Sequence, residues 1–315
     1  MGRYRVRPAR FIPALIITTC LAGLILWALW VSAAWAKGAV LQRMLDVRFM
    51  VRDEVDETVP VTGLLIRTEE LFQAPAPGEL VLKVRDGERL RAGAALAEIK
   101  GVSQNTVRSS KAGVFCAHVD GLESLLVPEK IGTLDLTAVE NIKESAPASD
   151  NKVDSGQFFG KVVDNLQPVF IHIRWENARP EASGTFRAGE TAYMNYNGRE
   201  LTGQIKDVIT TGGNMYMMVE MRGYPDEFIH RRDIELKLVV RRLSGWLAPR
   251  EAVVFKDGQP GLYVVLKQRV SWIPVSVNDR LGDQVSVTGS GLGEALRYIS
   301  NPDRVDEGTR LATGG

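Results

Sequence analysis

The sequence predicts a mainly β protein that is tied to a membrane by an N-terminal helix. Residues 11–36 contain no charged side chain, whereas the chain beyond Val59 is filled with short apolar runs. These runs are separated by Asp-Gly and Asn-Gly pairs, which are turn signals. Many short strands with such turns indicate sandwiches or barrels. A length of 315 residues allows about two or three domains beyond an anchor.

The first segment has the composition of a transmembrane helix. About 20 helical residues cross a bilayer core of roughly 30 Å, so we expect residues 11–35 to lie in the lipid bilayer. Residues 1–10 hold four arginines and no acid. This excess of positive charge predicts an N-terminus on the inside. We therefore expect a single-pass protein of the cytoplasmic membrane with its bulk outside the cytoplasm.

Two other interpretations of this segment stay open. Ala34-Trp35-Ala36 fits a small-x-small cleavage motif, so a signal peptide cleaved after Ala36 is the main alternative. The apolar run exceeds the roughly 7–15 residues of a signal peptide core, which favours an anchor. Cys20 would suggest a lipoprotein, but it lies in the middle of the apolar run and follows Thr19, which is a poor match.

The region after the anchor changes from mixed to β-type patterning. Residues 36–57 alternate charged and apolar side chains and predict a helical or extended stem. Beyond them the chain repeats one unit twice, in which a glycine precedes an apolar strand and an Asp-Gly turn follows. The copies are Gly78 with Asp86-Gly87, and Gly113 with Asp120-Gly121. Two such copies predict a pseudo-symmetric β-sandwich, with the second strand at Val114–Val119.

The remaining chain carries further hairpin signals. Residues 146–156 are polar and rich in turn-forming side chains, so we expect a surface linker. Asn197-Gly198 within "AYMNYNGRELTGQI" is the strongest short-range hairpin signal in the chain. Strands are also expected on both sides of Asp257-Gly258.

The doubled unit resembles the barrel-sandwich hybrid, or lipoyl-like, domain of the HlyD-type membrane fusion protein (periplasmic adaptor) family. The segment with "FRAGETAYMNYNG" resembles that family's β-barrel domain. "GWLAPREAVVFKDGQPGLYVVL" resembles the return into its membrane-proximal domain. The resemblance implies a barrel-sandwich hybrid at 58–145, a β-barrel at 157–242 and a membrane-proximal domain at 243–315.

The resemblance also implies a function without catalysis. We expect an adaptor subunit of an export or efflux system, which couples to an inner-membrane transporter of ABC type and forms a homo-oligomer. One feature departs from the family: only "VSQNTVRSSK" separates the two sandwich halves, where relatives insert a long helical hairpin. At 1.5 Å per residue this segment could not reach an outer-membrane duct. It favours, as the alternative, a membrane-anchored scaffold in cell-wall assembly or cell division.

The chemistry-bearing residues predict no enzyme and no catalytic, cofactor or metal site. Lysine plus arginine, at 39, nearly balances aspartate plus glutamate, at 38, so nucleic acid is not an expected partner. The three histidines, His118, His172 and His230, fit none of the metal-binding motifs. We expect them to be ordinary strand or surface residues, and Cys116 to be a small buried hydrophobe.

Two motifs could suggest a bound group. Lys100 stands near the crossover where a lipoyl or biotinyl lysine is carried, but its neighbours match neither the biotinyl "MKM" nor the lipoyl "DKA" pattern. "GSGLGEA" at 289–295 lacks the third glycine of a dinucleotide loop and the GK[ST] of a phosphate loop. We predict an unmodified lysine, a simple turn and no cofactor.

Overall fold

The structure is a computed structural model that describes residues 21–28, 45–102, 104–133, 151–178 and 185–311. Strands dominate these residues, which confirms the mainly β prediction. They divide into two compact units. Unit 1 contains the chain up to Asp56 and from Arg242 onward, and unit 2 is Glu57–Arg241.

Only part of the predicted membrane segment belongs to the described chain. Residues 21–28 form a helix. Within the described ranges, no helix is both long and apolar enough to cross a bilayer. Residues 1–10, the rest of segment 11–35, Cys20 and the stem up to residue 44 lie outside the described residues. The transmembrane helix therefore stays a prediction.

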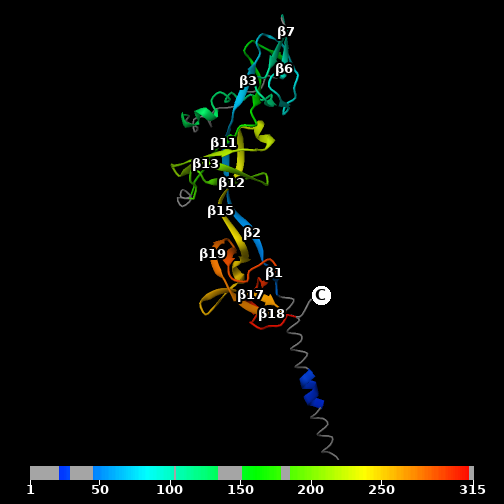
Figure 1. Ribbon diagram of the computed structural model, residues 1–315, viewed down its shortest axis with the longest axis vertical. Coiled ribbons are helices and arrows are strands. Elements are labelled where there is room, and N and C mark those ends of the chain that lie inside the picture. The colour runs from blue at the N-terminus through cyan, green and yellow to red at the C-terminus, as the bar shows by residue number, and fades with distance from the viewer. Residues whose placement is uncertain (1–20, 29–44, 103, 134–150, 179–184, 312–315) are drawn as a thin grey trace, which may run out of the picture. The chain divides into compact units, whose positions relative to one another are not determined.

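The sandwich of unit 2 consists of two four-stranded sheets (Figure 1). Their orders are β3-β10-β8-β5 and β7-β6-β4-β9. Large buried side chains such as Phe72, Leu96 and Phe115 form its core. The strands are β3 (Glu69–Gln73), β4 (Gly78–Leu82), β5 (Arg89–Leu90), β6 (Ala95–Lys100), β7 (Gln104–Arg108), β8 (Gly113–Cys116), β9 (Lys152–Val153) and β10 (Phe158–Val163).

The repeated unit takes the same form in both sheets. Gly78 begins β4 and Gly113 begins β8. A Cβ would lie 2.6 Å from the Lys100 carbonyl oxygen at Gly78 and 2.4 Å from the Val163 carbonyl oxygen at Gly113. Only glycine permits such a close backbone approach. The second strand is shorter than the predicted Val114–Val119, because β8 ends at Cys116.

The strand pairing gives the sandwich other sequence boundaries than the predicted range 58–145. Residues 62–66 of β2 (Val51–Ile66) pair with β11 (Val169–Trp175), so they lie in the barrel sheet. β9, inside the predicted linker 146–156, pairs with β4. β10 pairs with both β3 and β8, so the sandwich continues to Val163.

The second part of unit 2 is a closed barrel. Its strand order is β12-β13-β14-β11-β2-β15, and the sheet closes because β12 also pairs with β15. Closure pairs the two outer strands of the barrel with each other, and apolar side chains fill its interior. The predicted Asn197-Gly198 turn is confirmed, with φ of 50° and 83°, as a type I′ hairpin requires. The remaining strands are β12 (Thr191–Tyr196), β13 (Arg199–Thr211), β14 (Asn214–Met221) and β15 (Asp233–Pro249).

Unit 1 combines both ends of the described β region. Its main sheet has the order β1-β21-β17-β16, with β18 paired to β17. β19 and β20 form a hairpin beside the last residues of β15. Part of the predicted stem is thus strand and not helix. The strands are β1 (Val47–Phe49), β16 (Val253–Lys256), β17 (Gln259–Leu266), β18 (Arg269–Pro274), β19 (Ser276–Leu281), β20 (Gln284–Thr288) and β21 (Arg297–Ile299).

Short 3-10 helices connect some of these strands. Their bounds are η2 (Pro128–Thr133), η4 (Asp226–Ile229), η5 (Arg250–Ala252) and η6 (Pro302–Arg304). η4 buries Phe228 and Ile229, and His230 follows it as the C-cap residue. His230 therefore lies between the end of η4 and the start of β15 at Asp233.

Candidate functional site

A network of six buried charged side chains lies where the sandwich joins the barrel within unit 2. Glu69, at the start of β3, is its centre, with a side chain that is 0% exposed. Its two oxygens lie 2.6 Å from Arg67 Nε and 2.6 Å from Arg232 Nη2. Lys161 Nζ lies 3.3 Å from the same carboxylate. The members are three cations and three anions: Arg67, Lys161, Arg232, Glu69, Asp120 and Glu123.

The other two carboxylates are satisfied in the same way. Arg232 Nε donates to Asp120 Oδ2 at 2.8 Å, and Lys161 Nζ donates to Glu123 Oε1 at 3.0 Å. The backbone N–H of Asp120 donates to Glu123 at 2.8 Å, and that of Leu122 donates to Asp120 at 2.8 Å. Asp120 and Glu123 therefore face both cations and backbone donors, which offsets the cost of burying their charges.

The surrounding charges favour the ionised forms of Glu69, Asp120 and Arg232. Burial opposes ionisation of Glu69, but the charges of Arg67 and Arg232 outweigh it and hold the pKa of that carboxyl below its usual range. The pKa of Asp120 is lowered for the same reason, by Arg232 and Lys161 against burial. Burial disfavours the charge on Arg232, yet the two carboxylates raise its pKa. The network is thus a structural clamp that holds β3, β10 and the start of β15 together.

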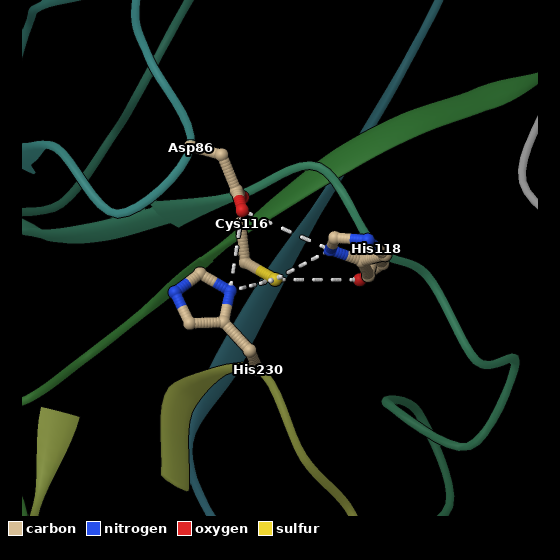
Figure 2. Close-up of side chains that lie close together, drawn as sticks. All are labelled: Asp86, Cys116, His118 and His230. Atoms are coloured by element: carbon tan, nitrogen blue, oxygen red, sulfur yellow. Dashed lines mark hydrogen bonds and ion pairs between the residues drawn. The ribbon is translucent and has the colours of Figure 1, made fainter. Parts of the chain in front are cut away.

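A second group of polar side chains, which we call the Cys-His cluster, consists of Asp86, Cys116, His118 and His230 (Figure 2). Asp86 lies in the turn between β4 and β5, Cys116 ends β8, and His118 follows it. His230 comes from the end of η4, which lies in the barrel part of the chain. One donor atom from each residue lies within 4.8 Å of the other three.

The contacts in the Cys-His cluster form a closed ring. Cys116 Sγ lies 3.4 Å from His230 Nδ1 and 3.9 Å from His118 Nδ1. Asp86 Oδ2 lies 3.4 Å from His230 Nδ1 and 3.9 Å from His118 Nδ1. The other oxygen of Asp86 accepts the backbone N–H of Ala117 at 2.8 Å, which orients the carboxylate. Figure 2 shows all four side chains pointing toward a common centre.

The convergence of these four side chains was not predicted from the sequence. Cys116 is fully buried, as predicted, and burial raises the pKa of its thiol. His118 and His230, expected as separate strand or surface residues, both face that thiol. The Cys-x-His spacing at 116–118 was the available signal, because alternate residues of an extended chain point to the same side. Nothing in the sequence connects them to His230, which is 114 positions from Cys116.

The other singled-out residues occupy ordinary positions. His172 lies buried in β11 and stacks on Tyr216 with ring centroids 5.6 Å apart. Lys100 is an exposed residue at the end of β6, and β7 begins at Gln104. The segment 289–295 lies between β20 and β21, outside either strand, as predicted for a turn.

Comparisons with known proteins identify the class of the sandwich. Residues 69–164 match the family model described as "RND related, barrel-sandwich hybrid domain". The chain therefore contains the barrel-sandwich hybrid domain that we predicted from its likeness to membrane fusion adaptors. The matched range includes β10, in agreement with the strand pairing. A comparison with curated proteins finds no match.

Several solved structures are distantly similar to the chain. ZneB from Cupriavidus metallidurans is 13% identical, with coverage of 85% of this chain and 95% of that chain and a TM-score of 0.35. MacA from Actinobacillus actinomycetemcomitans is 15% identical, with 81% and 99% coverage and a TM-score of 0.32. The membrane fusion protein Spr0693 from Streptococcus pneumoniae R6 is 9% identical, with 58% and 99% coverage and a TM-score of 0.32. Because all three TM-scores are low, no conclusion about this chain is drawn from these structures.

Proposed function

We propose that the chain is a non-catalytic adaptor subunit of an export system, anchored in the cytoplasmic membrane by residues 11–35. In this proposal the N-terminus is inside, and the β units outside the cytoplasm couple to an inner-membrane transporter and help to hand substrate outward. Copies of the chain assemble side by side as a homo-oligomer. The observation that carries the proposal is the matched RND-related barrel-sandwich hybrid domain at residues 69–164.

The partner belongs to one of two transporter classes. The likeness to HlyD-type proteins, noted from the sequence, favours an ABC-type permease. The description of the matched domain names RND systems instead. Identification of the co-purifying permease discriminates between these classes.

A second function is favoured by the crossover between the sandwich halves. β6 ends at Lys100 and β7 begins at Gln104, and the two strands pair with Lys100 opposite Gln104. This short connection stands where adaptor relatives insert the helical hairpin that reaches an exit duct. A membrane-anchored scaffold in cell-wall assembly or cell division would keep the fold without that reach.

Site-specific cross-linking tests the adaptor proposal. A photoreactive residue replaces Phe255 of unit 1, which is 70% exposed, in the full chain expressed in its native membrane. The matched control replaces Leu166 of unit 2, which is 82% exposed. In this proposal residues 243–315 form the membrane-proximal domain, which contacts the permease. We therefore predict a permease cross-link from position 255 and none from position 166. Cross-links only to envelope-assembly proteins would replace it with the scaffold function.

A further inference from the structure

We infer that the Cys-His cluster binds one divalent transition-metal ion of the Zn²⁺ type. This inference is independent of the proposed adaptor function. It rests on the donor set of one thiol, two imidazoles and one carboxylate, contributed by Cys116, His118, His230 and Asp86. These are the side chains that bind zinc in proteins.

The contacts converge on one point and do not form a proton relay. A Cys-His-Asp relay needs one ring nitrogen on the sulfur and the other on the carboxylate. Here Nδ1 of His230 faces both Cys116 Sγ and Asp86 Oδ2, and Nδ1 of His118 does the same. A shared central ion accounts for this arrangement, because every ligand then directs one atom to the same place.

The distances fit four-coordinate binding. With Zn–S near 2.3 Å and Zn–N or Zn–O near 2.1 Å, neighbouring ligand atoms of a tetrahedral site are separated by about 3.4–3.6 Å. The four contacts measure 3.4, 3.4, 3.9 and 3.9 Å. A flat ring with these sides could not keep all four atoms within 4.8 Å of one another. The ring is therefore folded toward a tetrahedron, and His118 alone needs to move inward by a few tenths of an ångström.

The charge of the four ligands and their positions in the fold are both compatible with a bound divalent ion. A thiolate and a carboxylate together neutralise a divalent cation, so its binding to the partly buried cluster leaves no net charge. Three ligands come from the sandwich and the fourth, His230, from the segment before β15. A bound ion would therefore cross-link the sandwich to the barrel part of unit 2, beside the buried charge network.

The test is metal titration of the purified full chain after treatment with a chelator. Co²⁺ is the spectroscopic probe and Zn²⁺ is the calorimetric probe. We expect one ion per chain, with thiolate-to-cobalt charge transfer and the intense visible bands of tetrahedral Co²⁺. His118→Ala is the main variant, since the side chain is 64% exposed and its loss spares the core. We expect it to weaken binding by at least about tenfold, and Cys116→Ser to remove the charge-transfer band.

The matched control is Asp226→Asn. Asp226 is 79% exposed and pairs with Arg89 at 3.3 Å near the same joint, but it contributes no atom to the cluster. This variant is expected to bind the ion like the unaltered chain. Absence of binding to the unaltered chain overturns the inference. So does binding that lacks a thiolate band and is unchanged by His118→Ala.

Discussion

Glu69→Gln is expected to loosen the sandwich far more than its small change in shape suggests. The buried network contains three cations and three anions, so the neutral amide leaves one excess positive charge among side chains that are at most 11% exposed. Removing one partner of a buried ion pair costs about 3–5 kcal/mol. Since 1.4 kcal/mol is a factor of ten, this corresponds to roughly two to three and a half orders of magnitude in the opening equilibrium.

Hydrogen exchange of the full chain measures this effect. The backbone amides of β10 are the reporters, because this strand pairs with both β3 and β8 at the centre of its sheet. Their exchange should accelerate by about the same factor when opening is in rapid equilibrium. Glu79→Gln is the control, since Glu79 is an exposed residue of β4 in the same domain and such surface changes stay within about 0.5 kcal/mol.

A double variant isolates the charge from other effects of the substitution. Glu69→Gln combined with Lys161→Met returns the network to two cations and two anions. Its loss of stability should fall short of the sum of the two single losses by about 0.5–3 kcal/mol. The reasoning is refuted if the single variant exchanges like Glu79→Gln, or if the two losses simply add.

Three further predictions concern stability. Glu69 has a lowered pKa in the folded chain, so its contribution is complete above the unfolded value, near about 4.3, and is lost as pH falls through the folded value. Denaturant midpoints should therefore fall more steeply with acid in the unaltered chain than in Glu69→Gln, and parallel curves would contradict this. Gly113→Ala should cost about 1–3 kcal/mol, because its Cβ would lie 2.4 Å from the Val163 carbonyl oxygen. Gly293→Ala, with nothing within 4 Å, is its control in thermal unfolding, and equal losses would be inconsistent with the predicted clash. Gly198→Ala should cost about 1–2 kcal/mol of stability, because Gly198 has φ of +83°. Gly198→Asn should cost less, since asparagine adopts this conformation more readily than alanine. The reverse order of the two losses in thermal unfolding would count against a type I′ turn.

Local chemistry in the sequence predicted the turns and the repeated unit. The Asn197-Gly198 and Asp257-Gly258 pairs both adopt positive φ between paired strands. Such pairs act over two residues, so no knowledge of the rest of the fold is needed. The glycines that begin β4 and β8 were also recognisable, although the carbonyl groups of Lys100 and Val163 that require them were not.

The features that could not be predicted from the sequence depend on pairing between distant parts of the chain. The run from Val51 to Gln73 looks continuous in β propensity, yet β2 joins the barrel sheet and β3 joins the sandwich. The choice depends on partners about 100 residues away, such as the pairing of Ile66 with Phe170. The Cys-His cluster and the charge network have the same origin, because His230 and Arg232 lie 114 and 112 positions from their partners Cys116 and Asp120.

Purification of the full chain from its native membranes tests the adaptor proposal most directly. A tagged chain at its natural abundance is extracted in mild detergent, and the proteins that stay bound are identified by mass spectrometry. An oligomer of the chain together with an inner-membrane permease of ABC or RND type is the predicted result. A monomer without any permease, or one bound only to cell-wall or division proteins, would contradict it.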